Sequence, residues 1–146
     1  MSKFAEYQTQ FSDPDVLCQA LGEMGFTANM IERNQTAQQL FDYHNRPTKY
    51  LDSNGDKAEI VIRRAYVNSV LSGGASNDIG FKRDSKGHYS AIISQFDSNY
   101  ANAAWMKKLS TAYCEKGILK KAKQQGYSYA GKQMVNGKIQ LQFIAA

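Results

Sequence analysis

The sequence predicts an α+β fold, in which a single antiparallel sheet carries two main helices packed on one face. Three patterns support this class: alternating apolar and polar residues over Phe4–Phe11, an apolar stripe within Leu17–Met24, and an Asn136-Gly137 turn between two alternating segments. Alternation with a period of two is typical of half-buried strands, whereas spacings of three and four residues are typical of helices. A length of 146 residues predicts one domain over residues 1–146.

The first strand and the first helix are separated by Asp13 and Pro14. The Asp13 carboxylate can accept hydrogen bonds from the free amides of the first helical turn, and proline fits the first helical position. Gly25 is expected to end this helix, because glycine readily adopts the left-handed conformation found there. The following residues up to Lys57 are rich in Asn, Gln and Asp, so we expect one or two weak strands with exposed loops.

The middle of the chain is expected to supply three further strands. Glu59–Val67 is rich in residues that favour strands, and a loop rich in glycine and serine is expected over residues 72–77. Ile79–Lys82 and Tyr89–Phe96 then form a hairpin around a turn at Asp84–Gly87.

A sheet with helices on one face leaves its other face in need of cover. The residues Val61, Tyr66 and Phe81 could supply an apolar surface there. We therefore expect a homodimer in preference to a monomer.

A long helix is expected from a cap at Ser98 or Asn99 to about Gln125. Its first half has an apolar face that consists of Trp105, Met106, Leu109, Ala112 and Tyr113. After Gly117 the apolar residues lie on a different side of the helix, so the helix is expected to bend or to rotate its buried face there. Three lysines then share the solvent side of the second half: Lys116, Lys120 and Lys123.

The chain is expected to end with a hairpin that belongs to the same sheet. Tyr127–Val135 and Lys138–Ile144 are joined by Asn136-Gly137, a strong signal for a tight hairpin turn.

The net charge of +5 is concentrated near the C-terminus. Between Lys107 and Lys138 there are eight lysines and one acid, Glu115, which leaves ten basic and twelve acidic residues elsewhere. Such a distribution suits an anionic partner, whether nucleic acid, membrane or acidic protein. The alternative interpretation is a solvated helix face that keeps a small protein soluble.

The sequence contains no convincing catalytic, metal or cofactor motif. Residues 126–132 match the first seven positions of a phosphate-binding loop, but Gln133 stands where serine or threonine is required, and the segment follows a helix. His44 and His88 are isolated, and the two cysteines, Cys18 and Cys114, lack the spacing of metal ligands. We expect no cofactor, no metal and no enzymatic activity.

The apolar runs are only a few residues long, so no segment is expected to span a membrane. No secretory signal is visible at the N-terminus. These observations predict a cytoplasmic protein.

A series of short segments resembles one known family. They are Met1–Phe4, Leu17–Phe26, Ala58–Arg63, Asp78–Phe81, Tyr113, Gly126-Tyr127 and Asn136–Leu141. In this order they resemble the "hypothetical chloroplast reading frame thirty-five" family, a domain of unknown function found in plastids, cyanobacteria and cyanophages. Lys3, the long 64–77 segment and the Ile144–Ala146 end depart from the family pattern, as a divergent phage copy would. The resemblance implies a photosynthetic setting, in a bacterial or host cytoplasm or a plastid stroma, and implies no catalytic residues.

The leading functional hypothesis is a small non-enzymatic adaptor that acts through a partner protein. The expected contact residues are Lys116, Lys120, Lys121, Lys123, Lys132 and Lys138. The alternative is a nucleic-acid-binding protein that uses the same basic helix and hairpin. A third hypothesis is a small-molecule enzyme or sensor in which His44 or His88 acts as an acid or base.

Overall fold

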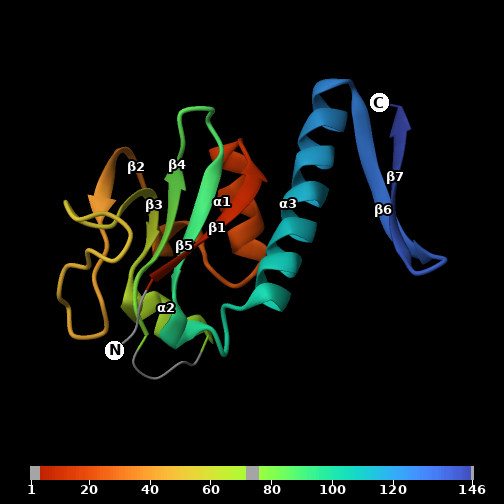
Figure 1. The fold of residues 1–146 in the computed structure, drawn as a ribbon. Coiled ribbons are helices and arrows are strands. Elements are labelled where there is room, and N and C mark those ends of the chain that lie inside the picture. The colour runs from red at the N-terminus through yellow and green to blue at the C-terminus, as the bar shows by residue number, and fades with distance from the viewer. Residues whose placement is uncertain (1–3, 72–75, 146) are drawn as a thin grey trace.

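An antiparallel sheet with helices on one face forms the body of the molecule (Figure 1). The computed structural model describes residues 4–71 and 76–145. The strands are β1 (Phe4–Phe11), β2 (Ile31–Gln39), β3 (Lys57–Ile62), β4 (Ile79–Arg83), β5 (Tyr89–Ser94), β6 (Tyr127–Val135) and β7 (Lys138–Ala145). The α-helices are α1 (Pro14–Glu23), α2 (Arg64–Leu71) and α3 (Ala103–Gln124), and two short 3-10 helices are η1 (Ala28–Met30) and η2 (Gln95–Asp97). The main sheet has the strand order β1-β5-β4-β3-β2, and β6 and β7 form a separate sheet. The predicted α+β class is therefore confirmed. The expected single sheet with two helices is incomplete, because a second sheet and a third helix are present.

The strand and helix predicted at the N-terminus are confirmed. Asp13 caps α1: its Oδ1 accepts hydrogen bonds from the Asp15 amide at 2.9 Å and the Val16 amide at 3.2 Å. Gly25 follows the helix with a φ of +102°, a left-handed conformation that suits glycine. The sequence predicted these helix ends correctly because the capping aspartate, the proline and the glycine each determine the conformation of only a few neighbouring residues.

The main core lies between the sheet and the helices. Leu17 and Leu21 of α1 and Leu109 of α3 are fully buried against the sheet. The strand residues that meet them alternate with residues of the opposite face, and they include Ile60, Ile62, Phe81, Ala91 and Ile93. Residues at every second position thus share the helical face, as the pleat of a strand requires.

The other face of the sheet is covered by the chain itself. Leu40 is fully buried there in a small cluster with Phe4, Val61 and Ile92. The segment after β2 folds back because the Leu40 amide donates a hydrogen bond to the Asp56 carbonyl at 2.8 Å. Packing on this face is tight at Gly80, where an added Cβ would lie 2.9 Å from Leu40 Cδ1.

The dimer surface expected at Val61, Tyr66 and Phe81 is therefore wrong. Val61 and Phe81 are both fully buried, Val61 under Leu40 and Phe81 under the helices. Tyr66 is 39% exposed, but it lies on α2 and not on the sheet. The expectation failed because it assumed that no segment covers the second face.

The strand expected over Glu59–Val67 ends early, at Ile62. The next residues form α2, and the buried Asp78 stabilises its start by accepting a hydrogen bond from the Arg64 amide at 2.8 Å. The same carboxylate accepts one from Arg63 Nη1 at 2.9 Å. The carboxylate that favours this helix is distant in sequence, which explains why local propensity misassigned these residues. Of the loop expected at 72–77, residues 72–75 lie outside the described residues.

Helix α3 starts later than expected. Asn102 is its cap, with Oδ1 accepting a hydrogen bond from the Trp105 amide at 3.0 Å, so the cap expected at Ser98 or Asn99 is wrong. Ser98 instead ends the short turn η2. The helix continues through Gly117 to Gln124. Of the apolar face predicted for its first half, Trp105 and Leu109 are buried, whereas Met106, Ala112 and Tyr113 are half-buried. No helix in the described ranges is long and apolar enough to cross a bilayer.

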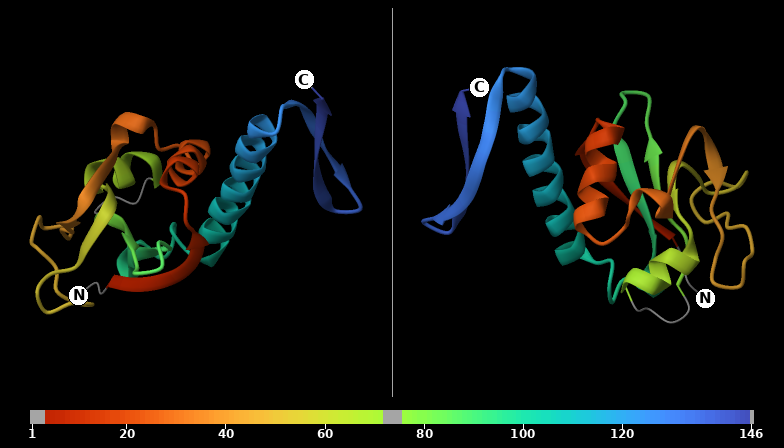
Figure 2. Two further views of the ribbon diagram at one scale, coloured as in Figure 1. Left: turned by 90° about the horizontal axis from the view of Figure 1, so that it is seen from above. Right: turned by 180° about the vertical axis from the view of Figure 1, so that it is seen from behind.

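The C-terminal hairpin forms as predicted but lies outside the main sheet. Asn136 and Gly137 both have positive φ, at +51° and +76°, as a tight hairpin turn requires. The hairpin lies on the side of α3 that faces away from the main sheet (Figures 1 and 2). It packs against the outer face of this helix, where Lys132 forms an ion pair with Glu115, and so it does not join an edge of the sheet.

Candidate functional site

A cleft of about 780 Å³ lies between α1, the second half of α3 and the start of β2. Its apolar lining includes the half-buried Leu119 and the buried side chains of Phe26 and Ile31. Four cationic side chains also line it: Arg33, Lys116, Lys120 and Lys123. The cleft thus brings together three of the six lysines selected from the sequence.

Lys120 is bound to the start of α1. Its Nζ donates a hydrogen bond to Asp13 Oδ2 at 2.6 Å, while Oδ1 of the same carboxylate caps the helix. Partial burial acts to raise the pKa of Asp13, but the hydrogen bonds from Lys120 and the Val16 amide outweigh it and hold this pKa below its usual value. The hydrogen bond to Asp13 in turn raises the pKa of Lys120. One carboxylate therefore both caps α1 and holds α3.

Two further ion pairs cross the cleft. Lys116 Nζ lies 2.8 Å from Glu23 Oε1 at the end of α1, and the hydrogen bond from Lys116 lowers the pKa of Glu23. Arg33 Nη2 of β2 lies 2.7 Å from Asp15 Oδ1. These pairs join the three elements around the cleft.

The expectation that Lys116, Lys120 and Lys123 share a free solvent face is therefore only partly correct. Lys116 and Lys120 face α1, and each has a carboxylate partner. Lys123 alone among the cations of the cleft has no carboxylate oxygen within 4.0 Å among the described residues. Three of the four cations of the cleft therefore have a carboxylate partner, namely Asp13, Asp15 or Glu23. Over the described part of the chain, the cleft thus has one unpaired cation, which is less unpaired charge than the number of lysines suggests.

The other three predicted contact residues lie elsewhere. Lys121 is exposed on α3 and does not line the cleft. Lys132 lies on β6, with its Nζ 3.3 Å from Glu115 Oε2. Lys138 begins β7 beside the hairpin turn. The six lysines therefore do not form one site.

Sequence reasoning missed the carboxylates of α1 and Arg33. A signal for part of this arrangement was present, because Asp15, Gln19 and Glu23 recur at four-residue spacing and so share one side of a helix. This polar stripe complements the lysine stripe of α3. Nothing local to Arg33 indicated its role, since its partner comes from another element.

The remaining candidate groups do not form a reactive centre in the cleft. Cys18 lines it, but burial raises the pKa of this thiol, which favours the protonated and less nucleophilic form. Neither His44 nor His88 lines it. Within the described ranges, no group of three or more His, Cys, Asp or Glu side chains is arranged to hold a metal ion.

Comparison with known proteins gives one match. Residues 20–142 match the model of a family described as "Protein of unknown function (DUF1257)". No curated protein and no solved structure matches the chain. Because the match covers most of the 146 residues, including α3 and most of the hairpin, the chain belongs to the DUF1257 family of proteins of unknown function.

Proposed function

We propose that the protein is a small non-enzymatic adaptor that binds an acidic, apolar segment of a partner protein in the cleft. The observation that carries this proposal is the combination of apolar side chains with four cationic ones around a single open cleft. A segment with both carboxylates and apolar side chains would match both components. Lys123 would meet its carboxylates first, because it has no ion-pair partner within the described part of the chain.

The charges of the cleft determine how a partner would be captured. The basic side chains Lys116 and Lys120 are already bound to carboxylates, so they serve to hold α3 against α1. Charges at the rim of an interface chiefly set the association rate and its dependence on salt. A partner with acidic groups would therefore be captured faster at low ionic strength.

The resemblance to the chloroplast reading frame thirty-five family suggests where the partner occurs. It favours a photosynthetic cell or a phage that infects one, with the protein in the bacterial or host cytoplasm or in a plastid stroma. This setting determines the lysate in which a partner should be sought.

The test compares Lys123→Glu with Lys121→Glu, a matched control two residues away that does not line the cleft. Both lysines are exposed, so neither reversal should disturb the fold. Tagged wild-type protein and both variants would capture partners from photosynthetic-cell lysate, with and without nuclease, for mass spectrometry. Reversal at Lys116 or Lys120 is less suitable, because it would place a second carboxylate beside Glu23 or Asp13.

The expected result is a partner protein that survives nuclease, is retained by K121E and is depleted several-fold by K123E. A synthetic peptide with the partner's acidic segment should then bind wild type, and bind K123E several-fold more weakly, in titration calorimetry. Equal capture by the two variants would show that the cleft is not the binding site.

A second candidate is the binding of single-stranded nucleic acid by α3 and the hairpin. It is favoured by the eight lysines between Lys107 and Lys138 and by Tyr127 and Tyr129, which are 47% and 48% exposed. Lysines can hold the phosphates while aromatic rings stack on bases. This candidate predicts loss of the captured material with nuclease, and an affinity that falls steeply with salt. A flat salt response would exclude it.

A further inference from the structure

The hairpin of β6 and β7 exposes a large amount of apolar surface. Five large apolar side chains on it are between 41% and 65% exposed: Tyr127, Tyr129, Met134, Ile139 and Ile144. Its main contact outside itself is with α3. A two-stranded hairpin is at best marginally stable alone, and clustered exposed apolar side chains mark interaction surfaces. The hairpin packs on α3, and these side chains leave apolar surface on it that α3 does not cover.

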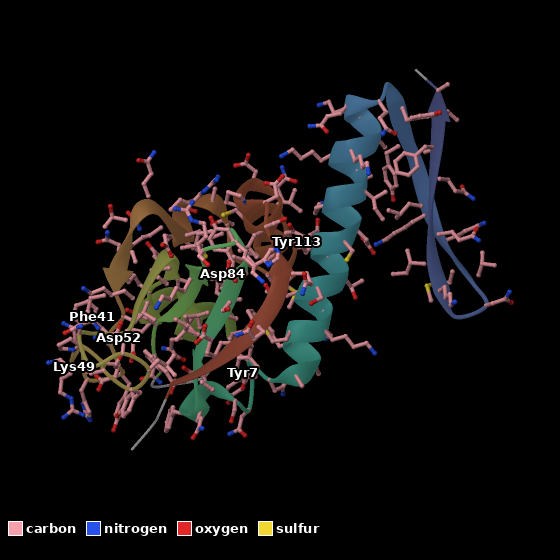
Figure 3. The ribbon with its side chains drawn as sticks, turned by 45° about the horizontal axis from the view of Figure 1, so that its top comes forward. Tyr7, Phe41, Lys49, Asp52, Asp84 and Tyr113 are labelled. Carbon is pink, nitrogen blue, oxygen red and sulfur yellow. The ribbon has the colours of Figure 1, made fainter. Side chains whose placement is uncertain are left out.

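A free strand edge is present on the same molecule. Within the described ranges, strand β1 is the end strand of the main sheet and pairs with β5 alone. Beside it a trough of about 630 Å³ runs between β1 and α3, lined by Tyr7, Phe11, Met106 and Tyr113 among others. Tyr7 and Tyr113 are labelled in Figure 3. An exposed strand edge is a template for pairing with another chain.

Six residues of β7 share the alternating pattern of six residues of β1, with the same residue at three of the six positions. Residues 6–11 read Glu-Tyr-Gln-Thr-Gln-Phe, and residues 138–143 read Lys-Ile-Gln-Leu-Gln-Phe. Laid side by side in the same direction, the two strands would place Tyr7 and Phe11 beside Ile139 and Phe143 on one face, and the glutamines of both strands beside one another on the opposite face. Lys138 would lie level with Glu6, and neither has an ion-pair partner among the described residues.

We propose that two copies of this chain form a dimer by exchanging hairpins. Strand β7 of each copy adds to the free edge of β1 in the other, parallel to it, with Lys138 level with Glu6 and Phe143 level with Phe11. This surface is distinct from the cleft and from the buried sheet face where the sequence suggested a dimer.

Each copy would contribute residues of its hairpin and of its trough to the interface. The two strands of the hairpin contain nine and eight residues, and eleven residues line the trough. Specific interfaces typically involve about 20–30 residues a side. The chain's own hairpin is a less suitable occupant, because α3 stands between it and the sheet, and the hairpin would have to leave this helix to reach β1 (Figure 2).

Cysteine cross-linking of the full chain tests the pairing directly. In a background with Cys18→Ala and Cys114→Ala, chains with Gln10→Cys are mixed with chains with Gln142→Cys under mild oxidation. The proposed register places these two positions side by side on the polar face, within the reach of a disulfide. The matched control mixes Gln10→Cys with Ser128→Cys, because Ser128 lies on the outer strand of the same hairpin.

We expect a disulfide-linked dimer from the first mixture in clear excess over the control, and a dimeric mass for wild type in sedimentation. A monomeric wild type, or equal cross-linking in both mixtures, would overturn the proposal. A chain with both Gln10→Cys and Gln142→Cys that links only within itself would do so too, because its own hairpin would then occupy the trough.

Charge reversal provides an independent check that leaves the apolar surface unchanged. E6K and K138E should each weaken dimerisation several-fold, because each puts like charges together at both junctions. A mixture of E6K and K138E chains restores opposite charges at both junctions and should dimerise as well as wild type. Failure of the mixture to recover would refute the parallel register.

Discussion

Replacement of Asp13 tests whether one carboxylate performs two functions. Asp13→Ala removes the acceptor for the amides of Asp15 and Val16 at the start of α1, and also the partner of Lys120. Loss of a helix cap costs about 1 kcal/mol, and up to about 2 kcal/mol in well-ordered sites. For a chain of this length each kcal/mol lowers the Tm by about 2–4 °C. We therefore expect a fall of about 2–4 °C from the cap alone, and a larger fall with loss of the ion pair.

Asp13→Asn separates the two functions. Asparagine caps helices about as well as aspartate, so this variant keeps the cap and loses only the charge that faces Lys120. Thermal and urea unfolding followed by circular dichroism should rank the proteins as wild type, Asp13→Asn, Asp13→Ala, in decreasing stability. The reasoning would be refuted if Asp13→Ala matched wild type, or if Asp13→Asn were as unstable as Asp13→Ala.

Three further predictions concern packing and burial. Gly80→Ala should destabilise the protein by about 1–3 kcal/mol in urea unfolding, because the added Cβ has no room. Gly22→Ala should stabilise it by up to about 1 kcal/mol, because there is open space beside this position of α1. Changes of the same sign in the two variants would contradict this reasoning. Phe81→Ala should cost about 3–5 kcal/mol and Tyr66→Ala well under 1 kcal/mol, so similar losses would contradict the burial assigned to the two rings. Burial raises the pKa of Asp97, so the native state binds this proton more tightly than the unfolded chain, and stability should fall as the pH rises above the ordinary value of 3.8. Asp97→Asn should remove this contribution to the fall of the unfolding free energy with pH, measured by urea unfolding at a series of pH values. An unchanged pH dependence would show that other groups cause the fall.

The elements that sequence reasoning placed correctly are those whose signals are local. The cap at Asp13, the end of α1 at Gly25 and the turn at Asn136-Gly137 each depend on conformations set within about four residues. The strand alternation over Phe4–Phe11 is equally local.

The errors arose where a distant residue decides the structure. Arg64–Leu71 became a helix whose first amide is bound by Asp78, and Val61 became buried because Leu40 returns over the sheet. The same cause applies to the site. The lysines of α3 were identified from the sequence, but their orientation depends on the carboxylates of α1, about 100 residues earlier. Pairing between elements is not visible in the periodicity of either one.

The pairing of β1 with β5 also determines the order in which the sheet can assemble. Strands β2 to β5 pair with their successors in the chain, so each pairing closes a loop of moderate length. Phe4 pairs with Ser94, across almost two thirds of the sequence, and the entropy lost on closing a loop grows with its length. During synthesis β1 emerges before the other four strands of this sheet, yet its partner β5 is the last of the five to appear. Of these five strands, the earliest in the chain is thus the last to be paired, and until then its backbone groups lack their partners in the sheet.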